Sequence, residues 1–99
     1  MQVNINSVHF KADKKLVAFI NEKVEKLSNF YEGVIGSDVT LKLENSEFPD
    51  NKIAEIRLFI RGNDLYAKKQ SKTFEEATDT AVDALKRQIA RHKNKLKIR

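Results

Sequence analysis

The sequence predicts an α+β fold with the element order β-α-β-β-β-α, a four-stranded sheet that carries two helices on one face. Three observations support this class. Four short segments alternate apolar and polar residues, as half-buried strands do. Two longer segments repeat apolar residues every three or four positions, as amphipathic helices do. The chain has 99 residues, of which 40% are hydrophobic, and this suits one domain with a buried core.

The first strand, helix and second strand are expected in the N-terminal half. Residues 2–8 alternate, with Val3 and Ile5 on one side. Asp13 is the expected cap of a helix. The apolar stripe of that helix comprises Leu16, Phe19, Ile20, Val24, Leu27 and either Phe30 or Tyr31. The second strand follows two glycines and alternates at Val39, Leu41 and Leu43. Because a helix joins the first two strands, we expect them to be parallel.

The second half is expected to form a hairpin and a long helix. Residues 45–52 are polar and contain the only proline, so they predict a loop. Residues 53–61 alternate most clearly, and Gly62-Asn63 is the expected turn into a fourth strand near residues 65–69. Thr73 with Glu76 predicts a capping box, and the helix it opens would run to Lys97, roughly 36 Å at 1.5 Å per residue.

Positive charge is concentrated near the C-terminus of the chain. The formal net charge is +5. Residues 1–65 hold nine Lys and Arg against ten Asp and Glu (net −1), and residues 66–99 hold ten against four (net +6). The cations that follow the last acidic residue, Asp83, are Lys86, Arg87, Arg91, Lys93, Lys95, Lys97 and Arg99. Such a concentration indicates a polyanionic partner, either nucleic acid or an acidic membrane surface.

Two basic ridges are expected on the second helix. One comprises Lys86, Lys93 and Lys97, and the other comprises Arg87, Arg91 and Lys95. Acids at the start of the helix and cations at its end also complement the helix dipole, and a solvated charged face is a further alternative. Dipole effects decay within about one turn, however, whereas these cations cover roughly four turns. Neighbouring like charges also repel, so we favour phosphate binding.

Two other regions are weaker candidates. On the first helix, Lys26 is placed to pair with Glu22, and Lys23 lies beside the apolar stripe. Neither lysine by itself therefore indicates a binding surface. On the open face of the sheet, the side chains that could stack unpaired bases are Arg57, Phe59, Arg61 and Tyr66. Cross-strand pairing is the commoner role of such residues and is favoured here. Lys68, Lys69 and Lys72 precede the second helix, and strand alternation puts the first two on opposite faces.

Little in the sequence supports catalysis. There is no cysteine, so disulfides and thiolate zinc sites are excluded. His9 and His92 lie on different elements without a neighbouring cluster of ligands, and no glycine-rich phosphate loop is present. We expect no enzyme activity, no metal, no cofactor and no small-molecule substrate. No apolar run approaches the roughly 20 residues that cross a bilayer, and no secretory signal is evident, so we expect a cytoplasmic protein.

Two sequence segments suggest a family. Residues 85–97, LKRQIARHKNKLK, combine a leucine, an arginine-glutamine pair, an apolar residue and a lysine-rich tail. Residues 19–27, FINEKVEKL, carry two lysines and a final leucine, and Asp79 follows in the second helix. In these features, and from Met1 to its end, the chain resembles the short form of the ribosome hibernation-promoting factors, also called ribosome-associated inhibitors or ribosomal subunit interface proteins.

The resemblance implies a function. Members of that family bind the small ribosomal subunit in the channel used by messenger and transfer RNA, against the 16S rRNA, and so inactivate and protect idle ribosomes. It implies that residues 1–99 form a single ribosome-binding domain, monomeric off the ribosome and without the tail that pairs ribosomes in long-form relatives. Carried over by position, the rRNA-binding residues are Lys23, Lys26, Lys86, Arg87, Arg91, Lys93, Lys95 and Lys97.

Two alternatives stay open from the sequence. A generic double-stranded RNA-binding domain shares the β-β-β-α portion, but it normally carries basic residues at the start of its last helix. Here that start is acidic, with Glu75 and Glu76. A peripheral membrane binder would need a cationic helix with a free apolar face, and we expect this helix to bury that face on the sheet.

Overall fold

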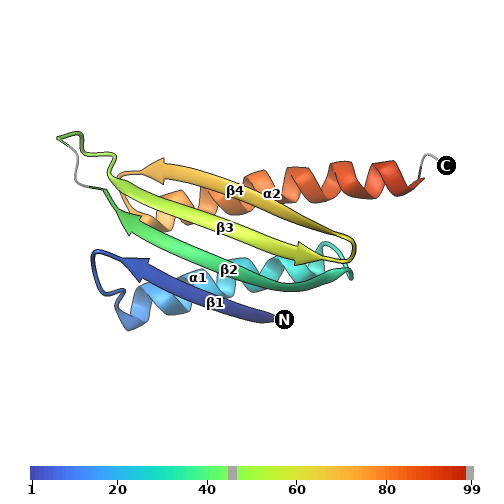
Figure 1. The fold of residues 1–99 in the computed structure, drawn as a ribbon, viewed down its shortest axis with the longest axis horizontal. Helices are drawn as coiled ribbons and strands as arrows, with labels where there is room; N and C mark the ends of the chain where they lie inside the picture. The colour runs from blue at the N-terminus through green and yellow to red at the C-terminus, as the bar shows by residue number, and fades with distance from the viewer. Residues whose placement is uncertain (45–46, 98–99) are drawn as a thin grey trace.

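In the computed structural model, four strands and two long helices follow the predicted order β-α-β-β-β-α (Figure 1). The structure describes residues 1–44 and 47–97, with side chains through residue 94. The elements are β1 (Gln2–Val8), α1 (Lys14–Glu25), the 3₁₀ helix η1 (Lys26–Asn29), β2 (Val34–Leu43), β3 (Lys52–Ile60), β4 (Asn63–Ser71) and α2 (Phe74–Lys97). The predicted fold class is therefore confirmed.

The sheet has the strand order β1-β2-β3-β4. β1 and β2 are parallel, as a helical crossover requires, and the two later pairs are antiparallel. The register aligns Ile5 with Val39, Val39 with Ile56, and Ile56 with Ala67. This row of apolar side chains crosses all four strands and faces the helices.

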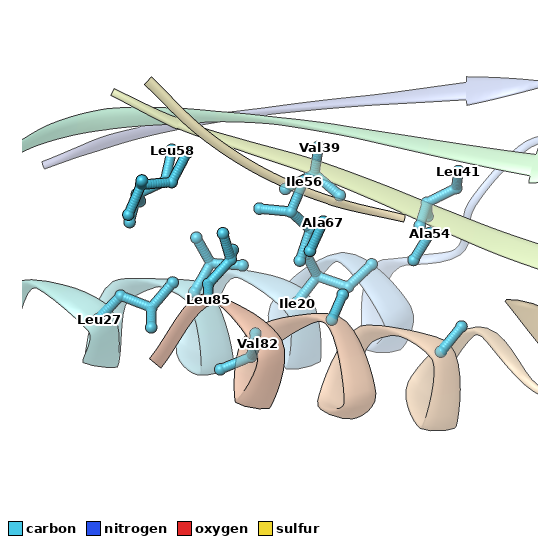
Figure 2. Close-up of a cluster of buried hydrophobic side chains, with 14 of the residues drawn as sticks. Ile20, Leu27, Val39, Leu41, Ala54, Ile56, Leu58, Ala67, Val82 and Leu85 are labelled. Carbon is cyan, nitrogen blue, oxygen red and sulfur yellow. The ribbon is translucent and has the colours of Figure 1, made fainter. Parts of the chain in front are cut away.

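Both helices cover the same face of the sheet and bury the core between them and the strands (Figures 1 and 2). α1 contributes Ile20 and Val24, which are fully buried. α2 contributes Leu85 and Ile89, with exposed fractions of 0% and 1%. Large buried residues of this kind cost about 2–5 kcal/mol when truncated to alanine. These buried residues therefore hold α2 on the sheet as far as Ile89.

Side-chain caps define where both helices begin. Asp13 Oδ1 accepts a hydrogen bond from the Leu16 amide at 2.8 Å, which confirms the expected cap of α1. At α2, Thr73 Oγ1 accepts from the Glu76 amide at 3.0 Å. This is one half of the predicted capping box, the half in which the cap hydroxyl satisfies an otherwise unpaired helix amide.

The end of the first helix differs from the simplest sequence expectation. The α-helix stops at Glu25, and the chain tightens into η1 before it turns toward β2. Of the two aromatic residues proposed for the buried stripe, Tyr31 packs against the core, whereas Phe30 is 45% exposed. The reason is that the helix ends before position 30, so the 3.6-residue period no longer fixes the direction of that side chain.

The hairpin between β3 and β4 is shifted by one residue from the prediction. Ile60 pairs with Asn63, so the two turn residues are Arg61 and Gly62. Gly62 has φ of +78°, a backbone conformation that glycine adopts without a steric penalty. β4 is also longer than expected at both ends. The predicted loop at 45–52 lies between β2 and β3 except for Lys52, which is the first residue of β3, and its residues 45 and 46 fall outside the described part.

Candidate nucleic-acid interface

The predicted site residues lie on α1, η1 and α2, which sit side by side over the sheet (Figure 1). Lys23 and Lys26 occupy the C-terminal end of α1 and the start of η1. The cations of α2 follow its middle, at Lys86 and beyond. The contacts of each side chain show which of these charges share a surface and which are already paired.

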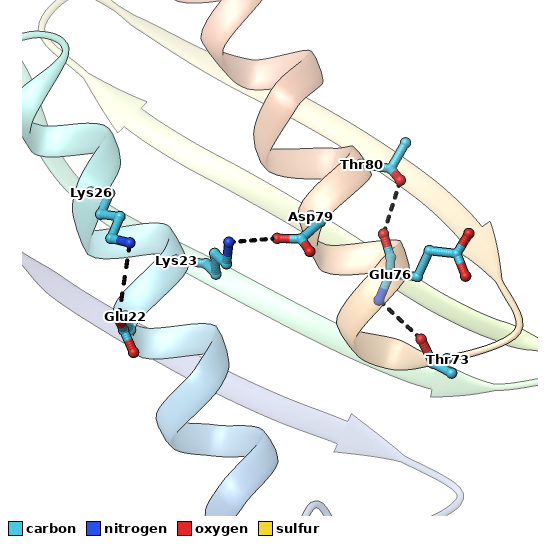
Figure 3. Close-up of polar contacts among 7 residues, drawn as sticks. All are labelled: Glu22, Lys23, Lys26, Thr73, Glu76, Asp79 and Thr80. Carbon is cyan, nitrogen blue, oxygen red and sulfur yellow. Dashed lines mark hydrogen bonds and ion pairs between the residues drawn. The ribbon is translucent and has the colours of Figure 1, made fainter.

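Lys23 is paired with a residue of the other helix. Its Nζ lies 3.1 Å from an Asp79 carboxylate oxygen, with side-chain exposed fractions of 36% and 48% (Figure 3). The same ammonium lies 5.6 Å from the centre of the Phe19 ring. The ion pair links α1 to α2, a contact between distant residues that sequence periodicity could not reveal. A phosphate that binds Lys23 has to compete with Asp79.

Lys26 is paired along its own helix. Its Nζ lies 3.8 Å from a Glu22 carboxylate oxygen, the i, i+4 contact that the sequence predicts (Figure 3). Both side chains are more than half exposed, at 55% and 72%. Exposed pairs of this geometry contribute about 0.3–0.5 kcal/mol. The Lys26 ammonium is therefore easily released to another anion.

The first predicted ridge of α2 faces the end of the first helix. Lys86 Nζ lies 4.8 Å from the centre of the Phe30 ring, a cation–π distance. Lys93, about two turns further on, donates a hydrogen bond from Nζ to the Phe30 carbonyl oxygen at 2.7 Å. Lys86 and Lys93, whose side chains are described, thus both contact Phe30. The ridge's third member, Lys97, has a side chain outside the described residues.

The second predicted ridge lies elsewhere on α2. At 100° per residue, Arg91 is roughly 140° around the helix from Lys86, so the two ridges do not form one patch. Arg91 lies at the junction with the β3–β4 turn, in a groove of about 210 Å³ lined by Asn63, Leu65, Gln88, Arg91 and His92. Gln88 donates a hydrogen bond to the Tyr66 carbonyl oxygen at 2.8 Å and fastens this side of the helix to β4. Lys95, in the same ridge, has a side chain outside the described residues.

Among the cations of α2 whose side chains are described, Arg87 and Arg91 are the least compensated. Both are exposed. Within the described residues, neither arginine makes an ion pair, and neither contacts Phe30 as Lys86 and Lys93 do. Guanidinium groups present a planar set of donors that suits phosphate oxygens. These two arginines therefore offer positive charge to a partner without first breaking an internal contact.

The start of α2 does not continue the basic surface. Glu75 and Glu76 are exposed in its first turn. The Glu76 amide is already bonded to Thr73, and the Thr80 hydroxyl donates to the Glu76 carbonyl oxygen at 2.9 Å. Both the charge and the occupied amide disfavour an anion at this end.

Cross-strand pairs occupy the open face of the sheet. The Tyr66 hydroxyl donates to Glu55 at 2.6 Å, and Lys42 lies 3.0 Å from the same carboxylate. The Tyr66 hydrogen bond and then Lys42 lower the pKa of Glu55, while the bond to Glu55 and burial raise the pKa of Tyr66. Arg57 lies 3.6 Å from an Asp64 oxygen. This network agrees with the cross-strand pairing favoured from sequence over a platform for stacked bases.

Neither histidine belongs to a ligand cluster. Within residues 1–44 and 47–97, no three His, Cys, Asp or Glu side chains stand close enough to hold a metal ion. The His92 ring instead meets Tyr31 edge-on, with ring centres 5.5 Å apart. Across the same described residues, no helix is both long and apolar enough to span a membrane.

Comparison with known proteins gives matches over nearly the whole chain. The family model described as "Sigma 54 modulation protein / S30EA ribosomal protein" matches residues 3–97. A protein of Salmonella typhimurium named "Ribosome hibernation promoting factor" is 31% identical over 97 residues, which cover 98% of each chain. A protein of the same name from Escherichia coli strain K12 is 28% identical over the same share.

Solved structures show the same fold. The N-terminal domain of Protein Y from Thermus thermophilus superposes with a TM-score of 0.80 at 20% identity, over 93% of this chain and 99% of that one. A ribosomal subunit interface protein from Coxiella burnetii superposes with a TM-score of 0.84 at 13% identity, over 95% and 99%.

Proposed function

Because the chain belongs to the Sigma 54 modulation protein / S30EA ribosomal protein family, we propose that it is a ribosome hibernation factor. It binds the small ribosomal subunit against the 16S rRNA, in the channel used by messenger and transfer RNA, and thereby inactivates and protects idle ribosomes. In this proposal the chain is a cytoplasmic, non-enzymatic inhibitor, monomeric off the ribosome, and residues 1–99 act as one ribosome-binding domain.

The observation that carries the proposal is a pair of exposed arginines, unpaired within the described residues, on a helix that is anchored to the sheet. Arg87 and Arg91 are exposed and unpaired within the described residues, and the helix that bears them is fixed by buried Leu85 and Ile89. Sequence concentrates a net charge of +6 in residues 66–99. The full-length match to relatives named ribosome hibernation promoting factor supports the ribosome as the source of the polyanion.

Inhibition in this scheme follows from occupancy rather than chemistry. Each phosphate that a lysine or arginine neutralises releases counterions, so the logarithm of the binding constant falls with the logarithm of salt by about 0.7–0.9 per contact. Contacts to an RNA backbone read shape more than sequence. A folded domain held in this way excludes other RNA from the space it fills.

The two competing interpretations lose support from the structure. The duplex-binding domain would place cations at the start of its last helix, where Glu75 and Glu76 stand. The membrane binder would need a free apolar face, but Phe74, Leu85 and Ile89, the large apolar residues of α2 with described side chains, are buried on the sheet. Ribosome binding through the later part of α2 fits both observations.

Co-sedimentation with purified small ribosomal subunits tests the proposal. The wild-type protein should pellet with subunits at low salt and be released steeply as salt rises. The double variant Arg87→Glu/Arg91→Glu should lose binding by about a hundredfold or more, since two attractive contacts become repulsive. The matched control is Lys14→Glu/Lys15→Glu, which changes net charge equally at the opposite end of α1 and should bind almost as wild type.

Two results would overturn the proposal. Equal binding of the wild-type protein to plain duplex RNA would favour the generic duplex-binding domain. Equal loss in the Lys14→Glu/Lys15→Glu control would show that overall charge, rather than the α2 surface, determines binding.

A further inference from the structure

A small groove lies where η1 meets the basic half of α2. Its volume is about 240 Å³. The residues that line it are Phe30, Lys86, Ile89, Ala90, Lys93 and Asn94. An aromatic ring and aliphatic side chains thus share one small space with two ammonium groups and one amide. Phosphate binding alone explains the lysines, but it does not explain the exposed ring.

Phe30 is presented to solvent from a fixed backbone. Its side chain is 45% exposed, and the core beneath is closed by its neighbour Tyr31. The Phe30 amide donates to the Leu27 carbonyl at 3.1 Å, and its carbonyl accepts from Lys93 at 2.7 Å. Both backbone groups are therefore held, so the ring projects to the surface from a fixed backbone position.

The chemistry around the ring selects the class of ligand. An aromatic face next to cations suits a nucleobase, which offers a π-surface joined to negatively charged phosphates. The Asn94 amide adds a donor and an acceptor for a base edge. Two lysines disfavour a cationic or purely apolar partner. We infer that this groove takes one unpaired nucleobase of RNA, stacked on Phe30, with Lys86 and Lys93 on its flanking phosphates.

Lys86 has to move for the base to enter. Its ammonium now lies 4.8 Å from the ring centre. An exposed cation–π contact is worth only about two- to fivefold in an equilibrium constant. A base stacked on an aromatic side chain is worth about five- to a hundredfold in affinity. The exchange is therefore favourable, and the displaced ammonium becomes available to a phosphate.

The inference rests on the proposed function, since it supposes an RNA partner, and it adds a contact that depends on the base rather than the phosphate. The test measures binding of the full chain to a short adenosine oligoribonucleotide and to a matched oligomer of abasic ribose phosphates. Wild type should prefer the adenosine oligomer by about tenfold. Phe30→Leu should lose that preference while its affinity for the abasic oligomer is unchanged, and Phe30→Tyr should keep it.

A matched control is Phe48→Leu, which alters another exposed phenylalanine, 74% exposed, in the β2–β3 loop. This variant should keep the wild-type preference. As a direct readout, the ring protons of Phe30 should shift upfield in NMR spectra when the adenosine oligomer is added, and should stay in place with the abasic one. Equal affinity of wild type for both oligomers, or a preference that survives Phe30→Leu, would overturn the inference.

Binding of each variant to small ribosomal subunits separates the two proposals. If wild type and Phe30→Leu bind subunits equally well, the stacking inference fails while the proposed function stands. If wild type does not bind subunits at all, the proposed function fails, whatever the oligomers show. Weaker subunit binding by Phe30→Leu, with wild-type behaviour of Phe48→Leu, supports both.

Discussion

Replacing Asp79 by asparagine should release the Lys23 ammonium and strengthen binding to the small ribosomal subunit. The two groups are 3.1 Å apart and are 36% and 48% exposed. A solvent-exposed pair contributes at most about 1 kcal/mol, which is about a fivefold change in an equilibrium constant. The Asp79→Asn variant should therefore bind up to about fivefold more tightly, and its free energy of unfolding should fall by up to about 1 kcal/mol.

The salt dependence gives the sharper assay. One additional phosphate contact should steepen the slope of log K against log salt by about 0.7–0.9. Equilibrium binding of labelled protein to small subunits over a salt series measures this slope, and urea denaturation measures stability. The control is Glu75→Gln, which makes the same change of charge one turn earlier on α2 and should alter the slope little.

A double-mutant cycle decides whether Lys23 is responsible. In a Lys23→Gln background, Asp79→Asn should have almost no effect on the slope, because the freed cation is missing. An equal gain in both backgrounds would refute this reasoning and show that Asp79 repels RNA directly. No gain in either background would show that Lys23 does not contact RNA.

Three further changes test the framework that carries the site. Thr78→Val should raise the free energy of unfolding by about 1 kcal/mol in urea denaturation, because the fully buried Thr78 hydroxyl has no hydrogen-bond partner within the described residues; unchanged or lower stability would contradict this. Thr73→Ala should lower that free energy by about 1 kcal/mol, whereas Thr73→Ser should not, since serine keeps the bond to the Glu76 amide. Tyr66→Phe should lower the free energy of unfolding most between pH 4.5 and pH 10.0, which are the ordinary pKa values of Glu55 and Tyr66. The pKa of Glu55 is lowered in the folded protein, so its contribution to stability is present above pH 4.5 and is lost as pH falls through that lowered pKa. The pKa of Tyr66 is raised in the folded protein, so its contribution is present below pH 10.0 and is lost as pH rises through that raised pKa. Denaturation curves over this range check the result, and a pH-independent difference would argue against the assignment.

Most of the fold was predictable because local periodicity and packing agree. Strict alternation over residues 53–60 fixed which side of β3 is buried, and Ile56 and Leu58 are fully buried as expected. The turn at Gly62 was displaced by one residue, since alternation defines a face but not where pairing stops. The sequence left open whether Phe30 or Tyr31 joins the buried stripe, because the choice depends on where α1 gives way to η1 rather than on hydrophobic spacing.

The candidate site was predictable in its charges but not in its pairings. The i, i+4 contact of Lys26 with Glu22 follows from helix geometry alone. The contact of Lys23 with Asp79 joins two elements, and no local pattern encodes it. Helix phase, by contrast, is available from sequence: it places Arg91 roughly 140° around the helix from Lys86, which is why the two expected ridges lie on separate surfaces.

The most direct test of ribosome hibernation is competition on the small subunit itself. Labelled protein bound to purified small subunits would be challenged with messenger RNA and transfer RNA added together, and the fraction bound would be measured at equilibrium. If the protein occupies the channel, the two should exclude one another, and the Arg87→Glu/Arg91→Glu variant should fail to block transfer RNA binding. Simultaneous binding of protein, messenger RNA and transfer RNA to one subunit would contradict the proposed site.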